Sequence, residues 1–230
     1  MAALYSSVDA ARLLVEKGAD VNCVDAIGHK PLLLAVESTS FSLKCFPERN
    51  QLEIVRVLLE KGAEVDASNP DGSTPLLMAT ANGHFDCVRV LLRNGADPNR
   101  PGFQGRRPIG QAVIDDHFDI FSLLLDHAVD VDAEDDDGQT ALSYAAFCDR
   151  EECVHALLDR GADPDKKDKE GLTPWNYAAG GEHYELRDLL IRWNVYPERR
   201  GRAKEKSVEE SKDETANADI RPQASCCVVS

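Results

Sequence analysis

One sequence motif recurs every 33 residues, and this period constrains the fold more than any local feature does. Segments related to Gly-Ala-Asp-Val-Asn begin at Gly18, Gly62, Gly95, Ala128, Gly161 and Asn194. The first interval is 44 residues and the other four are 33. A second set of residues keeps the same register, namely Gly28, Gly72, Gly105, Gly138 and Gly171. The chain is therefore predicted to be a stack of repeated units, one of which contains an insertion.

Each repeated unit is predicted to contain two short helices joined by a tight turn. In the best preserved unit, Thr74 is a suitable N-cap and Pro75 a suitable first helical residue, because proline has no N–H to leave unsatisfied. Asn82 and Gly83 end this helix, since glycine tolerates the left-handed backbone of a sharp reversal. A second helix follows over residues 85–93. The unit is thus a turn followed by two antiparallel helices.

The second helices carry an apolar stripe at helical spacing, and one unit cannot bury this stripe alone. Stacked neighbours would bury it as one elongated core. The stripe residues are Ile54, Val55, Leu58, Leu59, Val88, Leu91, Leu92, Phe121, Leu124, Leu125, Val154, Leu157 and Leu158. Small residues recur in one phase of the first helices and would let these helices pack closely: Ala35, Ala79, Ala112, Ala145 and Ala178.

These units resemble the ankyrin repeat, a β-turn followed by two antiparallel helices. Residues 71–76 and 170–175 match the opening D-x-x-G-x-T-P-L of that repeat, and residues 82–84 and 90–92 match its inter-helix turn and second helix. The resemblance implies an all-α solenoid of stacked β-turn and helix-turn-helix units. Its expected parts are a partial repeat over residues 1–24, five repeats over residues 25–200 with an insertion near residues 38–48, and a disordered tail over residues 201–230.

The third complete repeat departs most from the family pattern. Arg107 stands at the usual threonine, Asp116 at the turn glycine, and Ala128-Val129 at the usual Gly-Ala. We therefore expect local opening to begin in this repeat. Both ends of the stack are also irregular. At the N-terminal end, residues 8–17 are predicted to form a second helix that is not preceded by a recognisable full first helix. At the other end, the residues predicted to close the core are Trp175, Trp193 and Tyr196.

The insertion lies between the two helices of the first complete repeat. Loops at such positions tolerate extra length and sometimes carry function. Its notable residues are Phe41, Leu43 and Phe46. These apolar side chains either fold back over the N-terminal edge of the stack or dock a partner, and we favour the first alternative.

Charge and composition exclude several functional classes. The chain carries 41 Asp and Glu against 26 Lys and Arg, a net charge of −15, and such a field repels phosphate backbones. We therefore expect no nucleic-acid partner. No segment approaches the ~18 consecutive apolar residues of a transmembrane helix, and residues 1–24 lack the pattern of a secretory signal. Seven cysteines without CxxC spacing predict neither a disulfide framework nor a zinc site.

No catalytic site is predicted. His84, His117 and His183 share one inter-helix position of the repeat, which indicates a structural role rather than a converging cluster. The acidic run at residues 134–137 lacks the alternating ligands of a calcium loop. Nucleotide-binding and acyl-transfer motifs are also missing from the sequence. We therefore expect no enzymatic activity, no metal and no cofactor.

The resemblance implies that the turn tips and the exposed sides of the first helices line a concave groove that binds proteins. The middle repeats place aromatic and aliphatic groups and an arginine at these positions, a composition typical of interface hot spots. The predicted partner-binding residues are Phe103, Arg106, Ile114, Asp115, Asp136 and Phe147. The alternative is that they are ordinary scattered surface residues. We expect a monomer that binds one or more proteins through this groove.

The periodicity stops after residue 200, where the chain becomes charged and poor in large apolar groups, so we expect disorder there. Cys227-Val-Val-Ser230 fits a C-terminal prenylation signal, and Cys226 is a neighbouring candidate for palmitoylation. Two interpretations follow. The favoured one is an ankyrin-type adaptor tethered to a cytosolic membrane face by lipid. The other is a soluble regulator of the cytosol or nucleus that masks one protein partner.

Overall fold

The computed structural model describes residues 8–37 and 48–195, which contain helices and no strand. The α helices are α1 (Val8–Glu16), α2 (Pro31–Val36), α3 (Glu48–Glu60), α4 (Pro75–Ala81), α5 (Phe85–Arg93), α6 (Pro108–Ile114), α7 (Phe118–Leu125), α8 (Ala141–Phe147), α9 (Glu151–Asp159), α10 (Pro174–Gly180) and α11 (Tyr184–Val195). A single 3-10 turn, η1 (Phe103–Gly105), precedes α6. The all-α class predicted from the sequence is confirmed.

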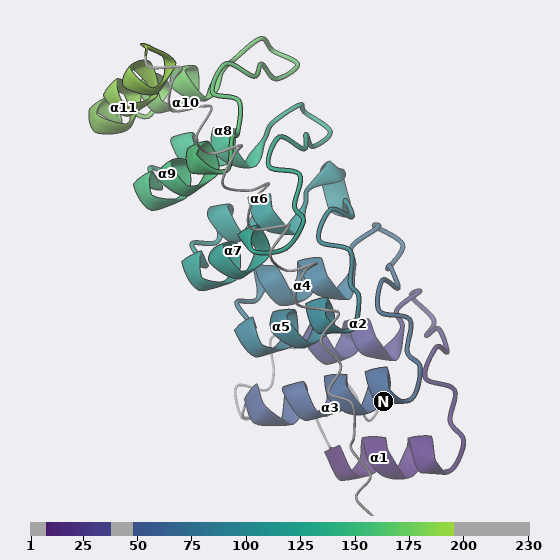
Figure 1. Ribbon diagram of the computed structural model, residues 1–230. Coiled ribbons are helices and arrows are strands. Elements are labelled where there is room, and N and C mark those ends of the chain that lie inside the picture. The colour runs from purple at the N-terminus through teal and green to yellow at the C-terminus, as the bar shows by residue number, and fades with distance from the viewer. Residues whose placement is uncertain (1–7, 38–47, 196–230) are drawn as a thin grey trace, which may run out of the picture.

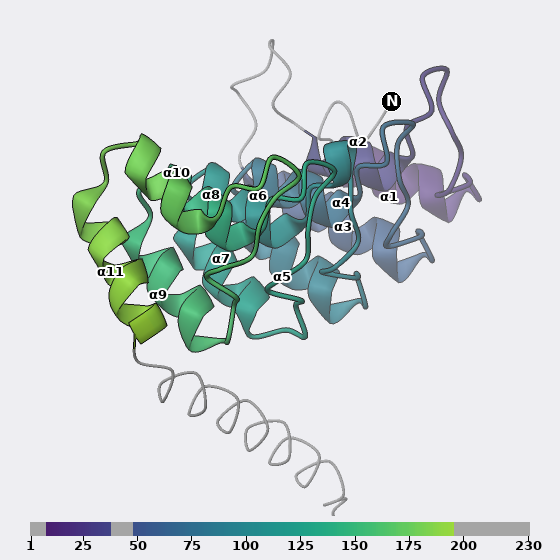
Figure 2. The ribbon, with the colours of Figure 1, turned by 90° about the horizontal axis from the view of Figure 1, so that it is seen from above.

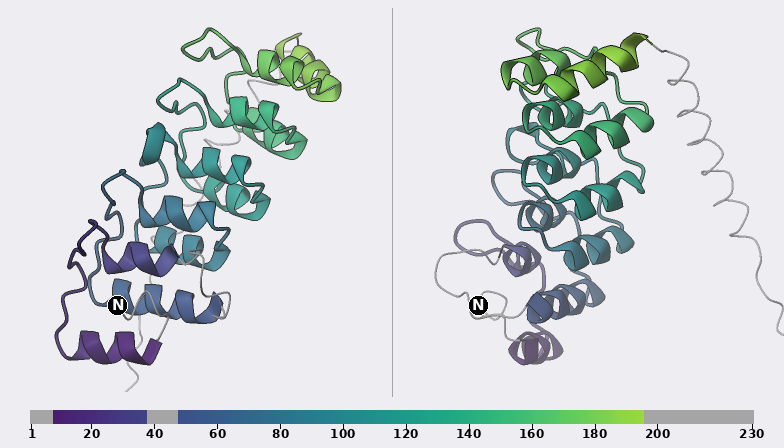
Figure 3. Two further views of the ribbon diagram at one scale, coloured as in Figure 1. Left: turned by 180° about the vertical axis from the view of Figure 1, so that it is seen from behind. Right: turned by 90° about the vertical axis from the view of Figure 1, so that its left-hand side faces the viewer.

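The helices lie in two layers along an elongated stack. The first helices of the repeats, α2, α4, α6, α8 and α10, pack one against the next in one layer, and the second helices form the other (Figure 2). A finger, meaning a short hairpin-like loop, precedes each first helix and projects from one side of the stack (Figure 1). The five fingers are residues 25–29, 69–73, 102–106, 135–139 and 168–172. Helices α1 and α11 lie at opposite ends (Figure 3).

The first helices begin where the sequence predicts. Proline occupies the first turn of α4, and the backbone amide of Leu77 donates to the Thr74 hydroxyl at 3.2 Å. The same bond recurs in α8, where the Ser143 amide donates to the Thr140 hydroxyl at 3.3 Å. These N-caps satisfy amides that would otherwise lack a partner at a buried helix end, so they set where α4 and α8 start.

The predicted stripe forms one continuous core through the whole stack. All its residues are buried except Leu59, which is half-buried, and Phe121 and Leu124 are completely covered. The five in-phase alanines of the first helices are also buried, which confirms their predicted role in close helix packing. Because each repeat covers the stripe of its neighbour, the fold is held by contacts between repeats.

A ladder of side-chain to backbone hydrogen bonds also joins each repeat to the next. The Asn99 amide nitrogen donates to the Ala128 carbonyl at 2.8 Å, and its oxygen accepts from the Asp130 amide at 2.8 Å. Asn22 makes the equivalent pair of bonds to the next repeat. Asp132, one repeat after Asn99, accepts from the Asp163 amide at 2.8 Å. This ladder explains the recurrent Asn or Asp that closes the 33-residue motif, a role that the period alone did not reveal.

The divergent third repeat is tied to its surroundings by Arg107. Its guanidinium donates to the Asn99 carbonyl at 3.2 Å and to the carbonyl of Glu134 in the following repeat. Asp116 adopts a left-handed backbone with φ of 61° and lies 2.8 Å from the Arg150 guanidinium. The substitutions that predicted a weak repeat therefore bring contacts of their own, and early opening of this repeat stays a prediction.

The insertion and the two ends differ in part from expectation. Glu48, placed in the insertion from the sequence, is the first residue of α3. The remaining insertion residues 38–47 lie outside the described ranges, as does Tyr196. At the C-terminal end Trp193 is buried as predicted for a closing residue, whereas Trp175 remains 39% exposed. Trp175 therefore closes the core only partly.

Burial of the stripe predicts a large loss of stability when one of its side chains is truncated. Leu124→Ala should lower the free energy of unfolding by about 2–5 kcal/mol, because the buried side chain leaves a cavity. Ile27→Ala is the control, since Ile27 is 66% exposed and its loss should cost less than about 0.5 kcal/mol. Urea denaturation measures both, and similar costs for the two variants would contradict a core shared between repeats.

The Arg107 contacts predict a second, local effect. Arg107→Ala should destabilise the fold by about 1–3 kcal/mol, because several backbone carbonyls lose a charged donor. Hydrogen exchange should accelerate in α6 more than in α4. The exposed Arg93 provides the control variant, Arg93→Ala. If both arginine variants behave like the parent protein, Arg107 does not hold the third repeat.

Candidate protein-binding surface

The fingers are rigid because each is closed by its own hydrogen bonds. In the fourth finger the Asp135 amide donates to the Gln139 carbonyl at 3.0 Å. The Asp135 carboxylate in turn accepts from the amides of Asp137 and Gln139. Asp168 repeats this pattern in the fifth finger. Aspartate at this position thus replaces water as the partner of turn amides and holds the finger in one shape.

The third finger keeps the same closure with a different residue. Gly102 stands where the other fingers have Asp or Asn, and its amide donates to the Arg106 carbonyl at 2.8 Å. Gln104 at the tip adopts a left-handed backbone with φ of 58°. The Gln104 carbonyl accepts from the Asp136 amide of the next finger at 3.1 Å. The third and fourth fingers are therefore joined through their backbones.

Two tyrosines on the first helices anchor the last two fingers. The Tyr144 hydroxyl on α8 donates to the Asp135 carboxylate. The Tyr177 hydroxyl on α10 donates to Asp168 at 2.5 Å and accepts from the Gln139 side chain at 2.5 Å. Burial, followed by the hydrogen bond to Asp168, raises the pKa of Tyr177 to about 12. These anchors were not predicted from the sequence, although the two tyrosines are 33 residues apart, in phase with the repeat.

The predicted partner-binding residues fall into two groups. Phe103 and Arg106 lie on the third finger, and Asp136 lies at the tip of the bonded fourth finger. The second group is Ile114 and Asp115 at the end of α6 with Phe147 at the end of α8. Helix α6 has seven residues, so about 10 Å of helix separates the groups along it.

Exposure differs strongly among these residues. Phe103 and Phe147 are 55% and 61% exposed, and Asp136 is exposed. Ile114, Asp115 and Arg106 are half-buried. Asp115 accepts a hydrogen bond from the Gln111 side chain at 2.6 Å, and Phe147 packs edge-on against Tyr177 with ring centroids 6.2 Å apart. We use the term finger face for the surface formed by the fingers and the exposed sides of the first helices. In the third and fourth repeats, Phe103 and Phe147 are the main exposed apolar side chains of the finger face.

The inter-helix histidines lie at structural positions. His183 lies against the preceding repeat, with its Nε2 3.2 Å from the Phe147 carbonyl oxygen. The His117 ring packs against Gly83, where an added Cβ would come within 2.8 Å of it.

Burial raises the pKa of the Cys153 thiol to about 12, which disfavours the reactive thiolate. Within the described residues no group of three or more His, Cys, Asp or Glu is arranged to hold a metal, and no helix there could cross a membrane.

The tyrosine anchors predict how stability depends on pH. Tyr177 binds its proton more tightly in the folded chain, with a pKa of about 12 against an ordinary value of about 10. Its stabilising contribution is therefore complete below pH 10 and is lost as the pH rises to 12. In Tyr177→Phe, the loss of stability across this window should be smaller than in the parent protein. Tyr184→Phe, at an exposed residue, should leave the parent profile unchanged; identical profiles for all three proteins would exclude the anchor.

Comparison with known families supports the repeat assignment. The family model for ankyrin repeats matches in three overlapping copies, over residues 1–102, 99–168 and 136–205. A search of curated proteins found no match. The three copies together span most of the chain, and their extent agrees with the stacked pairs of helices described above. The protein therefore belongs to the ankyrin repeat family, whose repeats generally mediate protein–protein interaction.

Proposed function

We propose that this protein is a non-catalytic adaptor whose finger face binds one protein partner at the third and fourth repeats. The observation that carries the proposal is the exposure of Phe103 and Phe147 on that face. Large exposed apolar groups on a rigid scaffold have a low entropic cost of binding, because few torsions are lost. The backbone bond between the third and fourth fingers supplies that rigidity.

The chemistry around the two phenylalanines favours a partner with mixed character. Arg106 approaches Tyr144, whose pKa is raised by burial and by its bond to Asp135 despite the nearby guanidinium. Asp136, at the tip of the adjoining fourth finger, is exposed. Aromatic side chains with flanking charges of both signs are typical of interface hot spots and their polar rims. A partner that reaches both phenylalanines must span the length of a first helix.

Removing the two aromatic rings tests this surface. Phe103→Ala combined with Phe147→Ala should abolish partner recovery in a quantitative pull-down from the native host, because an aromatic anchor often contributes about 2 kcal/mol or more to binding. Helical content measured by circular dichroism should persist, since both side chains are more than half exposed.

A matched control is Phe118→Ala. Phe118 is also an exposed phenylalanine, but it lies at the start of the second helix α7 and not on the finger face. This variant should recover the same partners as the parent protein. If the double variant also recovers an unchanged set of partners, the finger face at these repeats is not the binding surface.

We further propose attachment to a cytosolic membrane face through lipid on the C-terminal cysteines. Cys226 and Cys227 lie outside the described residues, so this proposal rests on the sequence Cys227-Val-Val-Ser230. One prenyl chain gives only marginal membrane affinity, and no basic cluster near Ser230 can add to it. Acylation of Cys226 would supply the second signal. A chain without lipid would instead act as a soluble regulator in the cytosol or nucleus.

The two cysteines have separable expected effects. Cys227→Ser should release the protein into the soluble fraction, because acylation of Cys226 follows membrane delivery by the prenyl group. Cys226→Ser should keep the prenyl label but bind membranes weakly, as a single lipid does. Labelling with an isoprenoid precursor in the native host, followed by fractionation, measures both steps. A parent protein without label would refute the anchor and favour the soluble regulator, while leaving the finger face untouched.

A further inference from the structure

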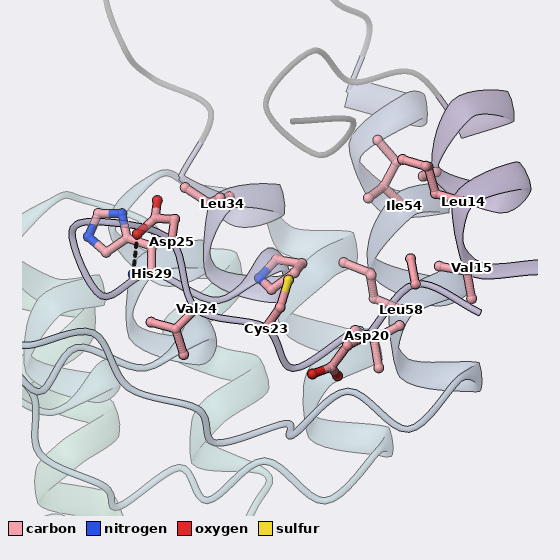
Figure 4. A pocket seen from close by; sticks show the side chains of 14 residues that line it. Leu14, Val15, Asp20, Cys23, Val24, Asp25, His29, Leu34, Ile54 and Leu58 are labelled. Atoms are coloured by element: carbon pink, nitrogen blue, oxygen red, sulfur yellow. Dashed lines mark hydrogen bonds between the residues drawn. The ribbon is translucent and has the colours of Figure 1, made fainter. Parts of the chain in front are cut away.

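An apolar pocket of about 200 Å³ lies at the N-terminal end of the stack, away from the third and fourth fingers. Helix α1, the loop that follows it, α2 and α3 enclose it (Figure 4). Leu14 and Val15 of α1 lie beside Ile54 and Leu58 of α3, and Leu34 of α2 lies across the pocket. Its lining is therefore mainly hydrocarbon, contributed by three helices and by the loop between α1 and α2.

The pocket lies at the end of the first layer of helices formed by the described residues. Helices α4, α6 and α8 each pack against a first helix on both sides. Helix α2 packs against α4 on one side, and among the described residues no first helix covers its other side. The pocket thus has the position of a helix that every inner repeat possesses.

The later repeats show how far the corresponding leucine is covered in the inner part of the stack. Leu14 is 48% exposed, whereas the residues in the same phase of the later second helices are at most 4% exposed. These residues are Leu58, Leu91, Leu124, Leu157 and Leu190. Val24, which also lines the pocket, is more than half exposed. A contiguous apolar surface of this kind marks a binding site for another helix or chain.

The rim of the pocket is negatively charged. Asp20 and Asp25 line it, and the hydrogen bond from the His29 amide lowers the pKa of Asp25, which keeps that carboxylate charged at neutral pH. Two of the nearby cations have acidic partners: Arg12 lies 3.4 Å from Glu53, and Lys30 lies 2.5 Å from Glu64. Charge complementarity therefore favours an occupant with basic side chains beside its apolar face.

We propose that this pocket binds an amphipathic helix of a partner protein, with an apolar face against Leu14 and Leu34 and Lys or Arg at its edges. The helix would lie against the side of α2 that no described first helix covers, and it would complete the core of the first repeat. This site lies at the first repeat, away from the third and fourth fingers, so the two surfaces together let one chain bridge two proteins. A helix bound in a groove of this type contacts the groove through apolar side chains at positions i, i+3, i+4 and i+7.

A displayed peptide library tests the proposal directly. Peptides of about 14 residues, roughly four helical turns, carry leucine at four anchor positions and random residues elsewhere. Selection on the immobilised full chain should enrich Lys and Arg at the positions flanking the anchors. An enriched peptide should bind Leu14→Asn about tenfold or more weakly than the parent protein, a difference expected when one buried leucine contact is lost.

Two control variants separate this site from general stickiness. Ile191→Asn changes an equally exposed apolar residue on α11 at the other end and should leave peptide affinity within about twofold. Asp20→Asn keeps a hydrogen-bond acceptor for the Asn22 amide but removes the charge, so affinity should fall and depend less on salt. Because Leu14 and Asp20 are both exposed at the surface, neither variant should unfold the chain.

Three results would overturn the proposal. The first is selection without enrichment, or enrichment of peptides that bind Leu14→Asn as tightly as the parent protein. The second is a marked gain in peptide affinity when residues 2–7 are deleted, which would show that the chain fills its own pocket. The third is a dimer in sedimentation that dissociates in Leu14→Asn, which would make a second copy the occupant.

Discussion

The structure depends on one interaction, the burial of the leucine-rich stripe of each repeat by its neighbour. A single helix pair has too little apolar surface inside itself to offset the entropy of ordering its chain. Adding a neighbour covers residues such as Leu91 and Leu124 completely. The hydrogen bonds of the Asn99 and Asp132 ladder then set the spacing between units. Stability is therefore shared between adjacent repeats and does not reside in any one of them.

The same arrangement determines where function can reside. Side chains that point into the stack are covered, so apolar groups remain exposed where stacking does not reach. Phe103 and Phe147 meet this condition on the finger face, and Leu14 meets it at the N-terminal end. The fingers add rigidity, because Asp135 and Tyr144 fix them to the helix layer. Two surfaces on one rigid body suit a protein that brings partners together.

Much of the fold was predictable because it follows from the period. Helix starts at Thr74, the buried stripe and the small alanines all depend on local chemistry repeated in phase. Contacts made by residues that break the pattern were not predictable. Arg107 was expected to weaken its repeat, yet its guanidinium bonds to carbonyls of neighbouring segments that only the folded chain brings near. Part of the insertion likewise became helix, since Glu48 starts α3.

The candidate site was predicted less completely than the fold. The exposure of Phe103 and Phe147 agrees with their predicted surface positions, but their separation depends on the length of the first helix and on the finger shape. The apolar pocket at Leu14 was not predicted at all. The sequence suggested an unprotected end, whereas the pocket arises from the meeting of α1, α2 and α3 in space. Local sequence patterns indicate which face of a helix is apolar. They do not indicate how the apolar faces of three helices come together to form a pocket.

Residue-resolved hydrogen exchange is the most direct test of the claim that neighbours hold each repeat. Among the described helices α1 packs on α3 alone within its layer, whereas α5 has neighbours on both sides. If neighbours hold each repeat, amides of α1 should exchange well before those of α5, and a peptide bound at the Leu14 pocket should slow exchange in α1. Protection in α1 equal to that in α5, in the free protein, would contradict the claim.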